Sequence, residues 1–184
     1  MESSLPALFH EWHDFYILVG TASATLVGLM FVAASIGATV FSEANRAALA
    51  AFITPTVVHF ASVLFACFVA VIPSHGWHSL GGVIGIGGLA GAIYSGRILV
   101  HVIIRHSFNV DLTDRMFYAL IPLVAYLLAV AAAVLLFEQS RMGADLIALA
   151  LLVLLFAGVR NAWDMMVWVV LKSPTSAPPS PPST

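Results

Sequence analysis

The stretch FYILVGTASATLVGLMFVAASIGATVF, from Phe15 to Phe41, contains no charged side chain. A helix needs about 20 consecutive, mostly apolar residues to cross the roughly 30 Å hydrocarbon core of a bilayer, because each residue advances it by about 1.5 Å. Backbone N–H and C=O groups find no water in that layer, so a helix that pairs them internally is expected. This stretch therefore predicts a transmembrane helix.

Four further segments meet the same criterion and follow at short intervals along the chain. They are Ala47–Pro73, Leu80–Ile104, Met116–Phe137 and Ala144–Leu171. The short connectors hold charged residues and turn formers, so consecutive helices are expected to be antiparallel neighbours. Residues 1–172 thus predict an all-α fold, a polytopic membrane bundle of about five transmembrane helices. Residues 173–184, SPTSAPPSPPST, predict a disordered tail rich in Pro and Ser.

The composition agrees with a membrane protein and excludes several other classes. The 184 residues are 61% hydrophobic and only 9% charged, whereas a soluble domain typically carries about 25% charged residues. The net charge of −2 provides no basic surface for nucleic acid. Cys67 is the single cysteine and lies in an apolar run, so we expect a buried thiol and no disulfide within the chain.

The distribution of Lys and Arg predicts the orientation in the membrane. Connectors on one side hold Arg46, Arg105, Arg115 and Lys172, and those on the other side hold Arg141 alone. Basic residues accumulate in cytoplasmic loops. We therefore expect the amino terminus outside and the carboxyl terminus in the cytoplasm.

Small residues recur every four positions in the first and third predicted helices. Such spacing forms a flat stripe along which two helices approach closely in a bilayer. Either packing within the chain or association between copies would use these stripes. The residues are Gly20, Ala24 and Gly28, then Gly81 with Gly85, and Gly87 with Gly91 and Ser95.

Five polar residues lie within the predicted spans: His59, Arg97, Arg160, Asn161 and Asp164. From the predicted helix ends, Arg97 and Asp164 lie about 10 Å deep and Arg160 and His59 about 16–18 Å deep, so one buried cluster is a hypothesis. Arg160 and Asp164 are four apart and predict an ion pair on one helix face. Either a clamp that orients the helices or an ion or proton site agrees with this pattern.

Pro55 lies one turn before His59 and cannot donate the hydrogen bond to the carbonyl of Ala51. We expect the helix to bend near His59. The freed carbonyl and the imidazole would also suit a water-lined cavity, and Tyr94 or Tyr126 is a candidate for its border. The sequence is compatible with both a simple bend and such a cavity.

Two His-x-x-His pairs lie on the predicted outer side. They are His10 with His13 and His75 with His78. If the two segments meet, four imidazoles would be available to zinc or copper. The alternative is an interfacial belt, in which histidines and tryptophans bridge water and lipid. A short His-x-x-His is common by chance, so we expect no cofactor and keep the metal site as an alternative.

Motifs for catalysis are missing from the sequence. It has no His-Glu-x-x-His, no Gly-x-Ser-x-Gly and no phosphate-binding loop. Asp164 is the only acidic residue deep in a predicted span, so an aspartate pair for proteolysis within the membrane is not available. We therefore expect a protein that is not an enzyme.

Two segments carry a resemblance to a known family. WHDFYILVGTASATLVGLMFVAASIGA, Trp12–Ala38, and RNAWDMMVW, Arg160–Trp168, resemble a family of small multi-pass bacterial membrane proteins. Members share a Trp-x-Asp-Phe ahead of a small-residue helix that ends Gly-Leu-x-Phe-Val-Ala, and an Asn-Ala-Trp near the carboxyl end. They are often labelled hypothetical or modulators of the FtsH protease. The resemblance implies a bacterial inner membrane location and makes Trp12, Asp14, Asn161 and Trp163 family positions.

Three hypotheses for function follow from these observations. The first is a membrane accessory or modulator protein whose helices associate in the bilayer with another membrane protein or with a second copy. The second is an oligomeric channel or transporter for an ion or small solute that uses the buried polar residues. The third is a protein that binds metal at its outer face.

Overall fold

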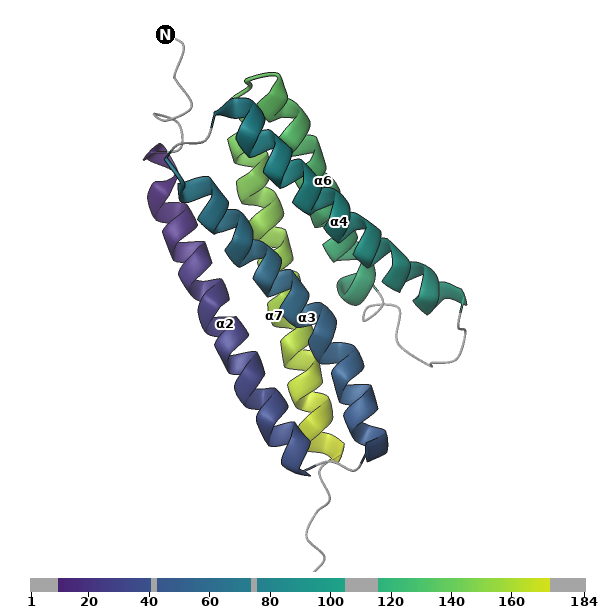
Figure 1. Cartoon of the computed structure of the whole chain (residues 1–184). Coiled ribbons are helices and arrows are strands. Elements are labelled where there is room, and N and C mark those ends of the chain that lie inside the picture. Colours follow the sequence, from purple (N-terminus) through teal and green to yellow (C-terminus); the bar gives the residue numbers. More distant parts are fainter. Residues whose placement is uncertain (1–9, 41–42, 74–75, 105–115, 173–184) are drawn as a thin grey trace, which may run out of the picture.

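The computed structural model describes residues 10–40, 43–73, 76–104 and 116–172, and within these ranges it is helical (Figure 1). Five helices are long and apolar enough to span a membrane, which confirms the predicted helix bundle. The elements are α2 (His13–Val40), α3 (Glu43–Val71), α4 (Trp77–Ile104), the π-helical turn η1 (Met116–Leu120), α6 (Ile121–Phe137) and α7 (Met142–Lys172). The tail at 173–184 lies outside the described residues.

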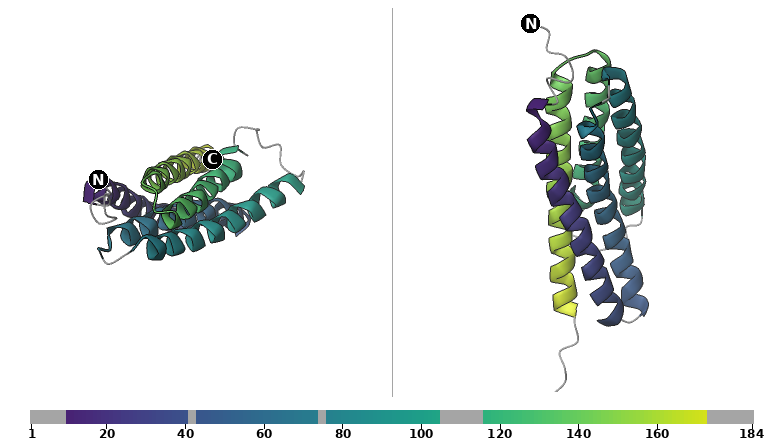
Figure 2. Two further views of the ribbon diagram at one scale, coloured as in Figure 1. Left: turned by 90° about the horizontal axis from the view of Figure 1, so that it is seen from above. Right: turned by 60° about the vertical axis from the view of Figure 1, so that its left-hand side comes forward.

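The helices are arranged in an order that differs from their order in the sequence. α2, α4 and α7 run in one direction, and α3 and α6 run in the other (Figure 1). The main contacts join α2 to α3, α3 to α7, α7 to α6 and α6 to α4. Helices α3 and α4 share a much smaller contact, which corrects the expectation that all consecutive helices are close neighbours. α2 and α4 are therefore the two edge helices (Figure 2).

The fourth predicted span is not a uniform α-helix. Its first turn, η1, is π-helical and ends two residues before Pro122. Pro122 has no N–H to donate to the carbonyl of Tyr118, four residues earlier, so the regular hydrogen-bond pattern fails at this point. A wider turn before a proline is one way in which a helix accommodates that loss.

A tight turn joins α6 to α7 and has a defined geometry. Gln139 adopts a positive φ of 56°. The N–H of Gln139 donates to the carbonyl of Leu136 at 3.0 Å, and the N–H of Ser140 donates to that of Leu135 at 2.9 Å. These two bonds form the Schellman motif, in which a residue in the left-handed region closes a helix. Glutamine here takes the place where glycine is usual.

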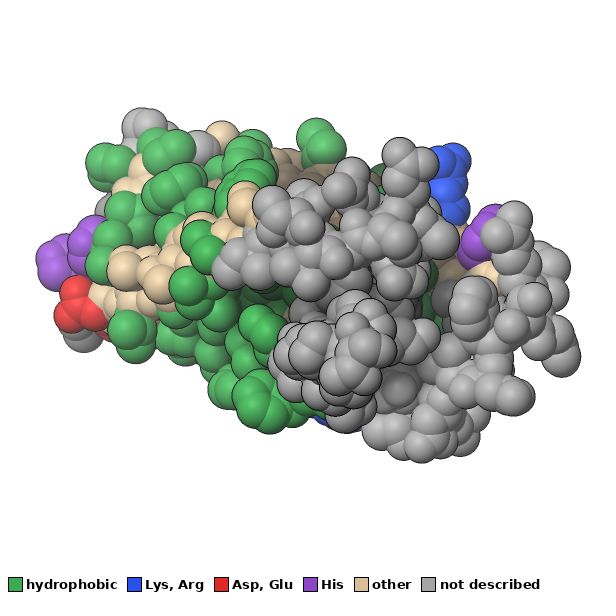
Figure 3. All heavy atoms as spheres, turned by 90° about the horizontal axis from the view of Figure 1, so that it is seen from below, with side chains coloured by type: hydrophobic (Ala, Val, Ile, Leu, Met, Phe, Trp, Pro, Cys, Tyr) green, Lys and Arg blue, Asp and Glu red, His purple; other side chains and the backbone are tan. Residues whose placement is uncertain are grey.

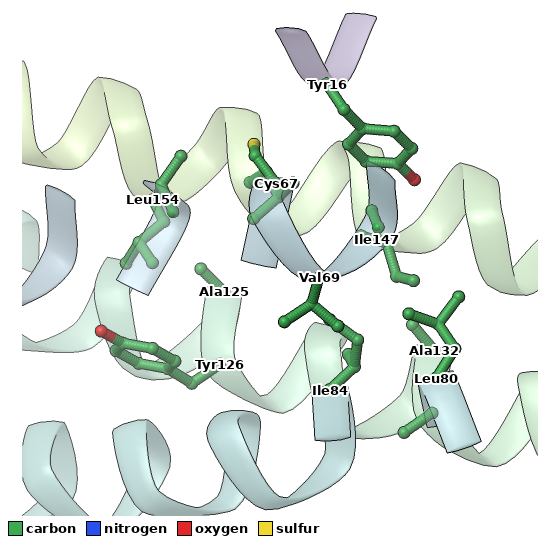
Figure 4. Packing of buried hydrophobic residues seen from close by; sticks show 14 of the residues in the cluster. Tyr16, Cys67, Val69, Leu80, Ile84, Ala125, Tyr126, Ala132, Ile147 and Leu154 are labelled. Carbon is green, nitrogen blue, oxygen red and sulfur yellow. The ribbon is translucent and has the colours of Figure 1, made fainter. Parts of the chain in front are cut away.

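Buried apolar side chains from all five helices form the core. Tyr16, Cys67 and Ile147 come together from α2, α3 and α7, while Ile84 and Ala132 pack between α4 and α6 (Figure 4). Cys67 is a buried free thiol, as predicted. A second, smaller cluster of Met30, Phe60 and Met165 joins α2, α3 and α7.

Many large apolar side chains point outward instead of into this core. Leu18, Ile86 and Phe156 each expose more than two thirds of their surface. Where the view from below shows described residues, most coloured side chains are hydrophobic, with a few charged and histidine side chains at the edges (Figure 3). An aqueous surface would not tolerate this distribution, whereas lipid does. The outer surface of the bundle therefore supports the reading of a multi-pass membrane protein.

The glycine stripe of α4 packs against α6, but with a different spacing from the one predicted. A Cβ placed on Gly81, Gly85 or Gly91 would touch Ala133, Leu136 or Tyr126 of α6, whereas one on Gly87 would meet nothing within 4 Å. Steps of four residues drift by about 40° each around a helix, because each residue turns it by about 100°. A stripe of contacting or buried residues instead alternates steps of four and three, through Gly81, Gly85, Gly88, Ala92 and Ser95, with Gly91 beside it.

The same drift separates the stripe of α2 from the core. Gly20 contacts the Cβ of Cys67 on α3, at 3.1 Å from an added Cβ, but Ala24 and Gly28 are exposed. Ser23 is buried in their place, and its hydroxyl donates to the carbonyl of Phe60 at 2.6 Å. The predicted stripe thus contributes only its first residue to packing within the chain.

Candidate functional site

A buried hydrogen-bonded chain of side chains links α3 to α6. The Nδ1 atom of His59 lies 3.1 Å from the hydroxyl oxygen of Tyr126. The Tyr126 hydroxyl donates to Ser62 Oγ at 3.0 Å, and the Ser62 hydroxyl donates to the carbonyl of Val58 at 2.8 Å. We call His59, Tyr126 and Ser62 the polar triad.

The direction of these bonds determines the tautomer of a neutral His59. The single hydroxyl proton of Tyr126 goes to Ser62, so the bond between His59 and Tyr126 requires a proton on Nδ1. A neutral imidazole then carries a bare lone pair on Nε2. His59 is fully buried, and its Nε2 has no hydrogen-bond partner among the described residues.

Local sequence explains how the polar triad is positioned. Ser62 follows His59 by three residues, so both side chains lie on one face of α3. Tyr126 comes from α6, and its ring packs on Gly91 of α4. An added Cβ at Gly91 would lie 2.2 Å from two ring atoms of Tyr126, so only glycine leaves room for this ring.

A small cavity adjoins the polar triad. It has a volume of about 80 Å³ and lies between α3, α4, α6 and α7. Ser62 and Tyr126 supply its hydroxyl groups, and the rest of its lining is apolar. Tyr126 borders this cavity, whereas Tyr94 and His59 do not line it. The water-lined cavity at His59 stays a prediction. Ser62 was missed, although its spacing from His59 was visible in the sequence.

The other predicted polar residues do not join this site. Arg160 and Asp164 form the predicted ion pair on α7, and both side chains are partly exposed. Arg97 is exposed on the edge helix α4. The ring of His59 bonds to Tyr126 on α6 instead. His59, Arg97 and the ion pair thus lie on α3, α4 and α7, and α4 packs mainly on α6. The hypothesis of one shared cluster stays a prediction.

Asn161 and Ser95 are two buried polar residues outside the polar triad. Asn161 is buried on α7, and its amide nitrogen has no hydrogen-bond partner among the described residues. The Oγ atom of Ser95 on α4 is also buried without a hydrogen-bond partner in the described part of the chain. Buried polar atoms of this kind are candidates for water or ligand.

The predicted outer histidines are only partly described. His10, His13 and His78 are exposed, and His75 lies outside the described residues. The ring centroid of His78 lies 5.8 Å from that of Phe137. Over residues 10–40, 43–73, 76–104 and 116–172, no three potential ligand residues gather as a metal site would require. The four-histidine site stays a prediction.

The groups of the polar triad are able to exchange a proton or hold a small polar molecule. A basic nitrogen, a phenol and a serine hydroxyl are present, but the only described carboxylate deep in a span is that of Asp164, which is paired with Arg160. Nucleophilic catalysis would require a base oriented on a nucleophile by a third group. Comparisons of the chain with protein-family models, curated proteins and solved structures found no match.

Proposed function

We propose that this chain is a membrane accessory protein that acts without catalysis, by association of α2 with a transmembrane helix of a second copy. The observation that carries this proposal is the exposure of Ala24 and Gly28 on an edge helix. Nothing lies within 4 Å of a Cβ added to Gly28. In lipid, helices associate through small faces that let their backbones approach closely.

The hydroxyl groups on this face support the same proposal. The hydroxyl of Thr25 donates to the carbonyl of Thr21 at 2.9 Å, and that of Ser35 donates to the carbonyl of Phe31 at 2.9 Å. Their polar atoms are thus satisfied within α2. A second copy of α2 offers the same face, and identical faces related by a twofold axis complement each other.

Location and orientation complete the proposal. The resemblance of the first helix to small bacterial membrane proteins favours the bacterial inner membrane. The excess of basic residues in alternate connectors favours an external amino terminus and a cytoplasmic carboxyl terminus. The odd number of candidate spans is compatible with termini on opposite sides.

Cysteine cross-linking tests the association directly. In a Cys67→Ala background, Ala24→Cys is expected to form a disulfide-linked dimer in membranes treated with a mild oxidant. Ala90→Cys is the matched control, because Ala90 is an exposed alanine on the other edge helix, α4. The expected result is at least a tenfold greater dimer yield for Ala24→Cys on a denaturing gel. Equal yields, or a monomeric mass for the wild type in mild detergent, would contradict the proposal.

A second candidate function is proton or small-solute transfer through the polar triad. The specific observation that favours it is the fully buried Nε2 of His59, which lacks a partner among the described residues, together with the adjoining cavity. A basic group at membrane depth is a candidate for a proton pathway.

Flux measurements on the Tyr126→Phe variant test this candidate. The variant removes the hydroxyl that joins His59 to Ser62, so proton flux into liposomes is expected to fall at least tenfold if the polar triad conducts. Tyr94→Phe is the control, because Tyr94 forms no hydrogen bond with a described residue. A stability loss of about 1–3 kcal/mol without any difference in flux would assign the triad a structural role.

A further inference from the structure

The start of α2 and the turn from α6 to α7 lie at the same end of the bundle (Figure 2). A hollow of about 490 Å³ opens there. It is independent of the polar triad and of the exposed face of α2. Two segments build it: the residues that lead into α2 with its first turn, and the α6–α7 turn with the start of α7. Its lining residues are Glu11, Trp12, Phe15, Arg141 and Asp145.

The walls of the hollow are joined across the two segments. Arg141 Nη2 donates to Glu11 Oε2 at 3.0 Å, and both side chains are more than half exposed. The Schellman turn at Gln139 holds Arg141 at this place, because the turn closes α6 two residues earlier. An exposed ion pair of this kind contributes little stability, but it defines the geometry of the opening.

The charges that line the hollow do not balance. Glu11 and Asp145 provide two carboxylates, and Arg141 provides one guanidinium group. Asp145 forms no hydrogen bond or ion pair with another residue in the described part of the chain. The lining therefore carries one uncompensated negative charge, which attracts a cation and disfavours a ligand that is only anionic.

Aromatic rings complete the lining. The rings of Trp12 and Phe15 meet edge to face, with centroids 5.4 Å apart and an interplanar angle of 87°. Indole rings attract ammonium groups through cation–π interactions, and tryptophans concentrate at the level of lipid headgroups. Trp12 directly precedes a helix long enough to span a membrane, so in a bilayer the hollow would open at headgroup level.

We propose that this hollow binds a phosphoethanolamine group, carried on a membrane phospholipid. The ammonium group pairs with Asp145 beside Trp12, and the phosphate pairs with the free side of Arg141. A primary ammonium donates hydrogen bonds to a carboxylate, which a trimethylammonium group cannot do. A purely anionic headgroup would leave Asp145 unpaired. The structure thus favours ethanolamine over choline and glycerol headgroups.

Lipid retention measured by mass spectrometry tests this site. Protein purified from micelles with equal amounts of phosphatidylethanolamine, phosphatidylcholine and phosphatidylglycerol is expected to retain the ethanolamine lipid preferentially. Asp145→Asn is expected to lower that preference roughly tenfold, since hydrogen bonds to charged groups contribute about 1.5–3 kcal/mol. Asp14→Asn is the matched control, because Asp14 is exposed at the same end of α2 but does not line the hollow.

Several outcomes would overturn the proposal. Equal retention of the three lipids by the wild type would do so. Trp12→Leu is a second variant, and an unchanged lipid preference in both Asp145→Asn and Trp12→Leu would also overturn the proposal. Asp145 also lies in the first turn of α7, where a carboxylate stabilises the helix. A purely structural role would therefore lower the melting temperature and leave lipid preference unchanged. If soluble phosphoethanolamine at a stoichiometric amount displaces the lipid, the ligand is a soluble molecule. This result would overturn the proposal that a membrane phospholipid carries the bound group.

Discussion

Replacing Gly91 with alanine is expected to lower the free energy of unfolding by about 2–3 kcal/mol, through overpacking and the loss of buried hydrogen bonds. The new methyl group would lie 2.2 Å from two atoms of the Tyr126 ring. The ring is buried and has to move away from α4. This movement breaks the bonds from Tyr126 to His59 and Ser62, so packing and the polar triad fail together.

Gly96→Ala is the matched control for this prediction. Gly96 lies on the same helix, and a Cβ there would meet nothing within 4 Å. Alanine favours a helix over glycine, so this variant is expected to be as stable as the wild type or slightly more stable. Reversible unfolding in mixed micelles gives the comparison. Equal stabilities of the two variants would show that the Tyr126 ring does not require glycine beneath it.

The second large effect is expected at Gly158, where α7 approaches α3. A Cβ at Gly158 would lie 2.5 Å from Cε1 of Phe60, a ring that is fully buried. Gly158→Ala is therefore expected to destabilise the protein by about 2–3 kcal/mol. The strain would extend to α2, because the carbonyl of Phe60 accepts the hydrogen bond from Ser23.

A double-mutant cycle makes this prediction specific. Phe60→Leu removes the ring atoms that Gly158→Ala would meet, so the double variant is expected to be more stable than the sum of the two single losses predicts. The expected coupling is about 1–2 kcal/mol. Additive losses would mean that the methyl group at position 158 does not meet the ring of Phe60. The same micelle unfolding assay supplies all four values.

The candidate site shows which contacts a sequence predicts well. The ion pair between Arg160 and Asp164 was predicted because residues four apart on a helix are neighbours whatever surrounds them. Assigning Arg97 and His59 to the same cluster rested on depth alone, because Arg97 matches the depth of Asp164 and His59 that of Arg160. Depth says nothing about the side of a helix or about its neighbours, and Arg97 lies exposed on α4.

The partner of His59 illustrates the opposite case. Tyr126 was a candidate neighbour of His59, but 67 residues separate them and their hydrogen bond depends on how α3, α4 and α6 pack. Gly91 makes that packing possible, and it was predicted only as one member of a stripe. The outer hollow depends in the same way on two segments 130 residues apart, at Glu11 and Arg141.

Length and hydrophobicity along the sequence were enough to determine five helices able to span a membrane, because each helix satisfies its own backbone and meets the bilayer criterion alone. Tertiary structure decided the order α2, α3, α7, α6 and α4, and with it the two edge helices. It also decided that Gly91 packs inside while Gly28 faces outward. Residues spaced by four drift around a helix, so only the packed bundle selects which of them meet a neighbour.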